Sequence, residues 1–386
     1  MFLSEMKIPL SEPLISGNEW KYIKDCLDTG WVSSVGAYVN RFEEMVANYV
    51  GTQYAIATVN GTSALHVSLL ACGVQPDDEV IVPTLTFIAP VNTVRYCGAH
   101  PVFMDCILNT FCMDVQKVKE FIIIECEQRR GGYTYNKRSG RRVKAIIPVH
   151  ILGHPVEMDE LVKICHQYNI DVIEDATESL GSQYKGKKTG TFGKIASLSF
   201  NGNKIITTGG GGMVLTNREE LASRVRHLTT QAKRDPFEYD HDEIGYNYRL
   251  TNVQAALGVA QMERLPEFIN IKRKNAEIYR RLLSDLKEVE IVWEAEGVIS
   301  NFWIYAIRVS RKDKRPLMDF LMAKGIQVRP LWKLIHTLPM YKDCQADNIG
   351  NAIDAYETCI SLPSSVTIRE EEINFVVSSI REFYNV

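Results

Sequence analysis

The stretch Tyr54-Ala55-Ile56-Ala57-Thr58-Val59-Asn60-Gly61-Thr62-Ser63-Ala64-Leu65 changes character at Asn60. Before Asn60 the residues are mostly apolar and suit a strand, whereas after Gly61 they suit a helix. A polar residue followed by glycine predicts a turn that joins a strand over 54–59 to a helix over 62–72. The free N–H groups of the first helical turn, next to the hydroxyls of Thr62 and Ser63, predict an anion-binding site at this junction.

The same alternation of short apolar runs and longer amphipathic runs continues to about residue 228. Strands are predicted over 54–59, 79–82, 101–105, 144–150, 171–174, 196–200 and 212–216, and helices over 62–72, 89–97, 115–126, 158–168 and 218–228. Alternating strands and helices are typical of βαβ units. The predicted fold class is therefore α/β, with a mostly parallel central sheet flanked by helices.

Around Pro266 the alternation stops. One helix is expected over 253–263 before this proline, and the elements after it are helices over 269–286, 313–325 and 370–384 and strands over 289–293 and 302–309. We expect residues 1–265 to form a large α/β domain with an N-terminal arm, and residues 266–386 to form a small C-terminal α+β domain.

The composition indicates a globular protein: 45% of the 386 residues are hydrophobic, 24% are charged, and the net charge is −3. Nucleic-acid-binding proteins typically carry a basic excess, so we expect small-molecule chemistry and no nucleic acid. The basic segment 127–142 is interpreted as a solvated surface hairpin rather than a nucleic-acid patch, because Gly131-Gly132 and Ser139-Gly140 mark two turns.

Nine cysteines without a CxxC pair are typical of neither a disulfide framework nor a zinc site. No apolar run approaches the about 18 residues that a membrane span requires, and the N-terminus lacks the apolar core of a signal peptide. We therefore expect a cytoplasmic protein without membrane contact. The eight histidines include no HExxH pattern, so no metal site is expected.

Two predicted strands end in side chains that are suited to catalysis. Val172-Ile173-Glu174-Asp175 ends in an acid, and Ser199-Phe200-Asn201-Gly202-Asn203-Lys204 runs into a polar turn that carries a lysine. Parallel sheets bind ligands at the carboxyl ends of their strands, so Asp175 and Lys204 are expected at one site. Alternatively, the acid caps a helix and the lysine is an ordinary surface residue. The glycine run after Lys204 leads into a strand, which excludes a dinucleotide-binding loop.

Together, these features meet the requirements of pyridoxal phosphate. The cofactor needs a lysine for its aldehyde, a carboxylate at its pyridine nitrogen and donors for its phosphate. Lys204, Asp175 and the turn at Gly61 would supply these groups. Phe87, at the end of another predicted strand, is placed to stack on the cofactor ring, unless it is a core residue.

Five segments occur in the order found in a known family: NGTSAL (60–65), PTLTF (83–87), VIEDATESLGS (172–182), SFNGNK (199–204) and GYNYRLTNVQAALG (245–258). The sequence resembles the pyridoxal-phosphate-dependent nucleotide-sugar aminotransferases of the DegT/DnrJ/StrS group, which have fold type I, over nearly its whole length. The resemblance implies that Lys204 forms the internal aldimine and later moves a proton. It also implies that Asp175 faces the pyridine nitrogen and Phe87 stacks on the ring.

The resemblance further implies a set of phosphate ligands, which are Gly61, Thr62, Ser63 and Ser199. Asn247 matches an asparagine that reaches the phosphate from the neighbouring subunit, which implies a homodimer with shared active sites. Glu178 stands where the family often has Gln or His, near the phenolic oxygen of the cofactor. A carboxylate at that position must be protonated or paired.

The variants of these motifs resemble one branch, the 4-aminotransferases of the bacillosamine and legionaminic-acid routes. This branch implies a UDP-linked 4-keto-6-deoxy-N-acetylhexosamine as substrate, with L-glutamate as amino donor, in surface-glycan or nonulosonic-acid biosynthesis. By the same resemblance, the residues that meet the sugar nucleotide are Trp31, Ser33, Ser34, Arg329 and His336.

Other activities remain open at this point. One is amination of a different ketosugar nucleotide, such as a GDP-linked, dTDP-linked or 3-keto sugar. Another is a cofactor-binding regulator without turnover. Sugar dehydratases of the same fold carry histidine in place of the lysine, and Lys204 argues against that activity.

Overall fold

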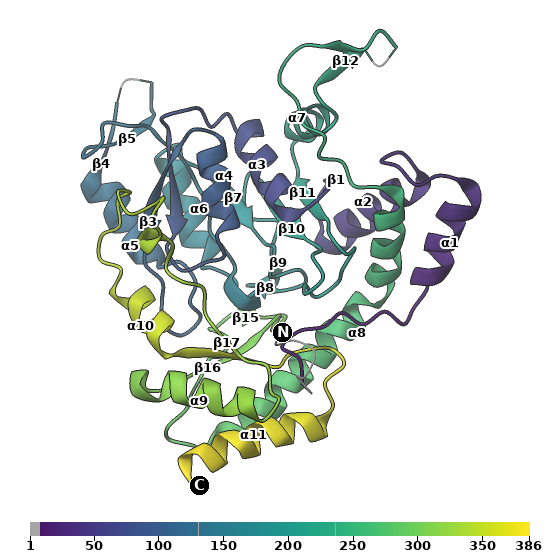
Figure 1. Ribbon diagram of the computed structural model, residues 1–386. Helices are drawn as coiled ribbons and strands as arrows, with labels where there is room; N and C mark the ends of the chain where they lie inside the picture. Colours follow the sequence, from purple (N-terminus) through teal and green to yellow (C-terminus); the bar gives the residue numbers. More distant parts are fainter. Residues whose placement is uncertain (1–7, 130, 236) are drawn as a thin grey trace.

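The computed structural model describes residues 8–129, 131–235 and 237–386 (Figure 1). At its centre is a seven-stranded sheet in the order β1 (Tyr54–Thr58), β11 (Gly212–Thr216), β10 (Ile195–Ser199), β7 (Asp171–Asp175), β6 (Val143–Ile146), β2 (Glu79–Pro83) and β3 (His100–Met104). Strand β11 is antiparallel to both neighbours, and the strands from β10 to β3 are parallel. The seven predicted strands and the α/β fold class are confirmed.

Helices cover both faces of this sheet because its buried strands are apolar on both sides. One face packs against α3 (Gly61–Ala71), α4 (Ala89–Tyr96) and α7 (Glu219–Thr229). The other face packs against α2 (Ala37–Val50), α5 (Val115–Glu120), α6 (Met158–Gln167) and the first half of α8 (Asn252–Leu283). Helix α1 (Glu19–Thr29) packs on α8, and α1 and α2 form the N-terminal segment for which no elements were predicted.

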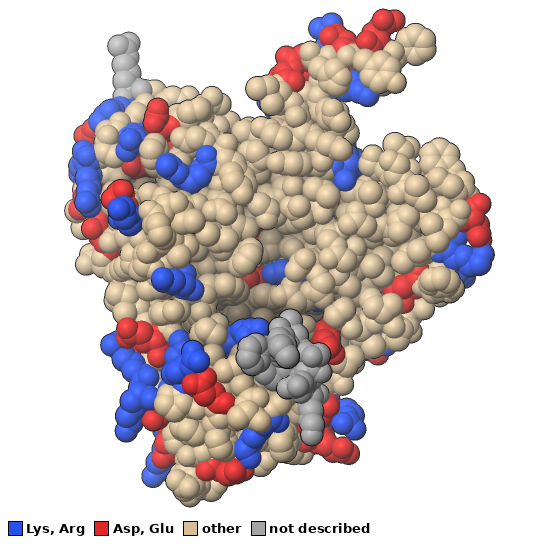
Figure 2. All heavy atoms as spheres, viewed as in Figure 1, with Lys and Arg blue, Asp and Glu red and all other residues tan. Residues whose placement is uncertain are grey.

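The predicted helix over 115–126 is shorter than expected, because α5 ends at Glu120 and a π-helical turn, Phe121–Glu125, follows it. Strands β4 (Cys126–Gln128) and β5 (Thr134–Asn136) then pair antiparallel, which confirms the predicted hairpin. Figure 2 shows lysine and arginine side chains gathered on this corner of the molecule.

The C-terminal part of the chain forms a second, smaller layer. Its antiparallel sheet has the order β14 (Glu290–Ile291), β16 (Tyr305–Arg308), β18 (Cys359–Leu362) and β17 (Arg329–Pro330). Helices α9 (Arg311–Ala323) and α11 (Glu370–Tyr384) pack on it together with the second half of α8, and α10 (Gly350–Thr358) leads into β18. This layer lies below the large sheet in Figure 1.

Helix α8 joins the two parts of the chain without a break. One helix was predicted on each side of Pro266, but the structure contains a single helix that includes this proline. Thr251 and Gln254 form a capping box at its start. Buried side chains hold the helix against both cores, with Leu265 in the core of the large sheet and Tyr279 in the core of the C-terminal layer. Packing on both sides offsets the backbone hydrogen bond that a proline removes. The predicted boundary at 265/266 therefore lies inside a helix, and the division into two domains stays a prediction.

Two further small sheets complete the fold. Strands β8 (Gln183–Tyr184) and β9 (Lys187–Lys188) form a hairpin that pairs with β15 (Val298–Ile299). Strands β12 (Lys233–Asp235) and β13 (Asp240–His241) form a hairpin that projects away from the body in Figure 1. Within the described ranges, no helix has both the length and the apolar character that a bilayer span requires.

Strand β7 places two neighbouring carboxylates on opposite faces of the sheet, because side chains alternate along a strand. Ile173 belongs to the core under α3 and Val172 to the core under α6, so Asp175 faces the α3 side and Glu174 the α6 side. Glu174 is fully buried. It accepts hydrogen bonds from His150 Nε2 at 2.9 Å and from the backbone N–H groups of Gly190, Phe192 (3.0 Å) and Gly193 (3.1 Å).

We expect Glu174→Ala to lower the free energy of unfolding by at least about 3 kcal/mol, because four donors, two of them on buried residues, lose their acceptor. Asp175→Ala is the matched control. Asp175 accepts one bond, from the Thr177 N–H, so we expect a change below about 1 kcal/mol. Urea unfolding followed by circular dichroism measures both, and equal losses in the two variants would contradict this account.

Candidate active site

A cavity of about 340 Å³ lies at the carboxyl ends of β2, β7 and β10, beside the start of α3. Small-molecule sites typically have volumes of about 300–1,000 Å³. The large sheet and the C-terminal layer both contribute to its wall, which is formed by Asn60, Gly61, Thr62, Leu65, Thr86, Phe87, Ala89, Pro90, Val149, Asp175, Thr177, Glu178, Ser199, Asn201, Asn203, Lys204, Trp303 and Trp332. Most of the residues predicted to hold a cofactor therefore line one cavity.

Lys204 enters this cavity from the loop between β10 and β11, and its side chain is 13% exposed. Its Nζ lies 3.8 Å from Glu178 Oε1 and 3.9 Å from the ring centroid of Trp303. Burial lowers the pKa of Lys204, and the negative charges of Glu178 and Asp175 act in the opposite direction. At a given pH, a larger fraction of Lys204 is therefore in the neutral, nucleophilic form than for an exposed lysine.

Asp175 lies at the end of β7 and is almost completely buried. The Thr177 N–H donates to its Oδ1 at 3.1 Å. Burial raises the pKa of Asp175, whereas this hydrogen bonding and the charge of Lys204 lower it. Residues 176–182 form turns rather than a helix, so Asp175 is not a helix cap.

Glu178 is also buried, and its two oxygens have different partners. Oε2 accepts from the Leu152 N–H at 2.8 Å, and Oε1 is the oxygen near Lys204 Nζ. Burial raises the pKa of Glu178 to about 7, and Lys204 opposes that rise. The carboxylate at this position is thus paired with Lys204 in the structure.

The start of α3 forms one end of the cavity. Asn60 caps the helix by accepting from the Ser63 N–H at 2.7 Å, which confirms the predicted strand–turn–helix junction. The first N–H groups of a helix have no partner within it, so those of Gly61 and Thr62 are available to an anion. A Cβ on Gly61 would lie 2.8 Å from Ser199 Cβ, so the close approach of helix and strand requires glycine. Ser63 is buried on the same turn and is not part of the cavity wall.

Phe87 follows β2 and is 52% exposed at the cavity, so it is not the core residue of the alternative interpretation. The stretch from Arg329 to His336 contributes Trp332 to the wall instead of the two predicted residues. Arg329 is exposed on β17, and His336 Nδ1 lies 2.6 Å from Thr84 Oγ1.

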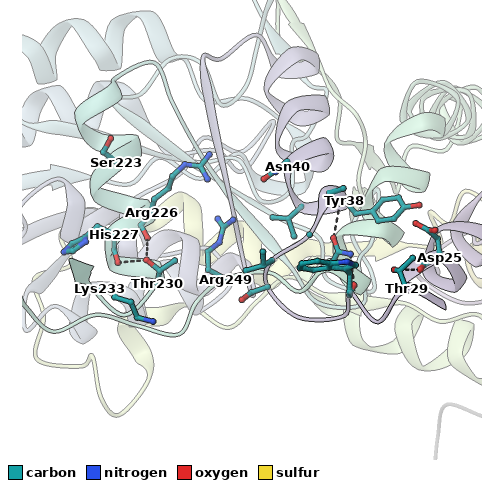
Figure 3. Close-up of a pocket in the computed structure, with 17 residues that line it drawn as sticks. Asp25, Thr29, Tyr38, Asn40, Ser223, Arg226, His227, Thr230, Lys233 and Arg249 are labelled. Carbon is teal, nitrogen blue, oxygen red and sulfur yellow. Dashed lines mark hydrogen bonds between the residues drawn. The ribbon is translucent and has the colours of Figure 1, made fainter. Parts of the chain in front are cut away.

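The other predicted residues lie elsewhere in the single chain. Asn247 is exposed and forms a bridge with Thr230. Trp31 and Ser34 line a second cavity, of about 970 Å³, and the carbonyl of Ser33 accepts from the Asn252 N–H at 2.6 Å. Figure 3 shows this second cavity between Asp25, Tyr38 and Asn40 on one side and a group of basic side chains, Arg226, His227, Lys233 and Arg249, on the other.

One group of side chains in the described ranges could gather around a metal ion: His227, Asp242 and Glu243. His227 Nε2 already lies 2.7 Å from Asp242 Oδ1, and Arg224 Nη2 donates to Glu243 Oε2 at 2.7 Å. These contacts are ordinary for surface ion pairs. The absence of a metal site stays a prediction.

Two tryptophans of the cavity were not predicted. Trp303 lies before β16, inside the strand that was predicted over 302–309, and Trp332 follows β17. Neither residue has a local signal of function, since only packing of the C-terminal layer against the large sheet brings them to Lys204. Asn201 and Asn203 also line the cavity. They belong to the SFNGNK segment, in which a polar turn at a strand end indicates a ligand site, so a local sequence signal exists for them.

Comparison with known proteins agrees with this geometry. The model of the DegT/DnrJ/EryC1/StrS aminotransferase family matches residues 13–381. The chain is 40% identical to the GDP-perosamine synthase of Escherichia coli O157:H7, over 98% of this chain and 99% of that protein. It is 38% identical to the GDP-perosamine synthase of Caulobacter vibrioides, over 97% of each chain.

Among solved structures, a putative sugar aminotransferase of Streptococcus pneumoniae in its PLP form has a TM-score of 0.88 and 25% identity, with 98% of each chain covered. This likeness confirms the predicted fold type I. Because the family match and the relatives above 30% identity extend over nearly the whole length, the chain belongs to the DegT/DnrJ/EryC1/StrS family of sugar aminotransferases.

Proposed function

We propose that this enzyme transfers an amino group, with L-glutamate as donor, to C4 of a ketosugar nucleotide. One observation carries the proposal: Lys204, Asp175 and the anion-binding start of α3 share one buried cavity. Each residue alone has an ordinary structural explanation. A lysine, a carboxylate and phosphate donors in one cavity are the set that pyridoxal phosphate requires.

Pyridoxal phosphate is the cofactor of this family, and it supplies an aldehyde that takes up the amino group and a ring that accepts electrons. The chain fits this group at each end. Gly61 and Thr62 offer N–H groups to the phosphate, Ser199 lies against Gly61, and the exposed ring of Phe87 is available for stacking. Asp175 lines the same cavity, and its carboxylate would hold a proton on the pyridine nitrogen.

Lys204 is the residue that we assign to proton transfer. Burial lowers the pKa of its amine, and the charge of nearby Glu178 opposes this shift, so the amine loses its proton more readily than that of an exposed lysine. In the neutral state Nζ accepts a proton, and in the charged state it returns one. The surrounding tryptophans and Phe87 limit the access of water to this exchange.

For the nucleotide, two candidates have support. The named GDP-perosamine synthases favour a GDP-linked sugar, because their similarity extends over nearly the whole chain. The motif variants around Asp175, Lys204 and Trp31 support the UDP-linked 4-keto-6-deoxy-N-acetylhexosamine that the sequence predicts. We propose the GDP-linked ketosugar as the first candidate and the UDP-linked sugar as the second.

We also propose a homodimer with shared active sites. Tyr246 and Tyr248 turn inward, where their rings stack at 4.9 Å and pack edge-on against His66 of α3, and this leaves Asn247 between them exposed. The projecting β12–β13 hairpin carries exposed Phe237 and Tyr239. Exposed aromatic side chains on a projecting element favour a protein partner.

We expect purified enzyme to absorb visible light as protein-bound pyridoxal does, and Lys204→Ala to lose this band together with at least about a thousandfold of transaminase activity. Lys187→Ala, at an exposed lysine of β9, is the matched control and should retain both. Absorbance spectra and a glutamate half-reaction measure the effects. A normal band in Lys204→Ala would contradict the assignment.

If Asn247 completes the site of the neighbouring subunit, mixing inactive Lys204→Ala with inactive Asn247→Ala should restore about a quarter of wild-type activity. Half of the dimers are then mixed, and each mixed dimer has one intact site. Native mass spectrometry checks that the subunits exchange. Mixed dimers no more active than the sum of their parents would exclude a shared site.

In a panel of 4-ketosugar nucleotides with glutamate, we expect the GDP-linked sugar to have the highest kcat/KM. A preference of about tenfold corresponds to one or two additional hydrogen bonds to the base. Preference for the UDP-linked N-acetyl sugar would select the second candidate. Preference for a dTDP-linked or 3-keto sugar would reject both while leaving the aminotransferase family unaffected.

A further inference from the structure

We infer that Trp303 is a positioning residue that holds Lys204 in the cavity through both its ring and its indole N–H. Trp303 is buried, and the centroid of its ring lies 3.9 Å from Lys204 Nζ. Its Nε1–H donates to the carbonyl of Asn203, the residue directly before Lys204, at 2.6 Å. One side chain therefore fixes the backbone next to the lysine and covers the amine at its end.

Trp303 is itself held by Lys272 of α8 and by Asn301, which lies two residues before it. The fully buried Nζ of Lys272, on α8, donates to the Trp303 carbonyl at 2.9 Å and to the Ser364 carbonyl at 2.5 Å. The Trp303 N–H donates to Asn301 Oδ1 at 2.9 Å. Buried hydrogen bonds of this kind give the ring a defined position, because leaving any of these groups unpaired is costly.

The same segment also fixes Glu178. Asn301 Nδ2 donates to the carbonyls of Glu178, at 3.1 Å, and Leu180, at 3.0 Å. Asn301 and Trp303 are two residues apart, so the C-terminal layer sets the positions of Glu178 and Lys204 relative to each other. The contact between Lys204 Nζ and Glu178 Oε1 depends on this segment, even though both residues belong to the large sheet's loops.

The cation–π geometry distinguishes Trp303 from the other tryptophan of the cavity. In the part of the chain that the structure describes, Lys204 Nζ lies over the ring of Trp303 and not over that of Trp332. A ring face within about 6 Å attracts an ammonium group, and the attraction is strongest where water is excluded. Trp332 is therefore a matched control of the same residue type in the same wall.

The test measures how accessible the Lys204 amine is in the full-length chain after removal of the cofactor. Reductive methylation with formaldehyde and cyanoborohydride, which reduces the imine that forms, is carried out across a pH series, and mass spectrometry measures the modified Lys204 peptide. The rate at high pH, where the amine is neutral, reports its position, and the midpoint of the profile reports its pKa. Methylation of exposed Lys187 is the internal reference.

We expect Trp303→Leu to raise the high-pH rate at Lys204 by about tenfold, because the indole ring no longer covers the neutral amine and its N–H no longer holds the backbone at Asn203. Trp303→Phe keeps a ring over the amine but loses the indole N–H, so we expect an increase of about threefold, whereas Trp332→Leu should leave the rate unchanged. An unchanged rate in Trp303→Leu, or equal increases in Trp303→Leu and Trp332→Leu, would overturn the inference. If Trp303→Leu does not fold, Trp303→Met fills more of the space without an aromatic face and carries the same expectation.

The inference rests on the proposed function only in treating Lys204 as the reacting lysine. The methylation rates need neither cofactor nor substrate, so they test the position of the amine alone. Protected Lys204 in a chain without transaminase activity would reject the proposed function and leave the inference intact. If Lys204 were methylated rapidly in an active wild-type enzyme, the inference about Trp303 would be rejected and the proposed function would stand.

Discussion

A lysine amine with little access to water needs partners nearby, and this requirement governs the architecture around Lys204. Glu178 and Asp175 supply negative charge from the end of β7, and the ring of Trp303 covers the amine. To bring these groups together, the fold must place two neighbouring strand ends side by side and pack the C-terminal layer across them. The parallel order of β7 and β10 meets the first condition, and the continuous helix α8 meets the second.

The sequence predicted the parts of this arrangement that local patterns encode. Apolar runs located the seven strands, and the residues around Gly61 identified the turn into α3. Side chains alternate along β7, which explains why Asp175 faces the cavity while adjacent Glu174 forms hydrogen bonds on the other face of the sheet. Trp303 and Trp332 were missed because their role depends on packing between distant segments. Pro266 was interpreted as a break because proline usually ends a helix, and here tertiary packing overrides that preference.

The Lys204 cavity and the residues predicted to meet the sugar nucleotide lie in different parts of the single chain. The Lys204 cavity contains the groups for amino transfer, and none of Trp31, Ser34 and Asn247 reaches it within one chain. Trp31 and Ser34 share their own cavity with basic side chains of α7 and the loop that follows it. The residues that we propose for nucleotide recognition therefore lie apart, within one chain, from those that we propose for catalysis, which is consistent with one family acting on several sugars.

The central claim is that Lys204 is the lysine that binds the cofactor, and the chain contains a natural competitor. Lys272 is buried, and burial lowers its pKa to about 7, but its Nζ donates to the carbonyls of Trp303 and Ser364, and Lys272 is not part of the cavity wall. Borohydride reduction of the cofactor-loaded enzyme, followed by peptide mapping, identifies the lysine that carries the pyridoxyl group. The account predicts the modification on Lys204, and a modification on Lys272 or on any other lysine would contradict it.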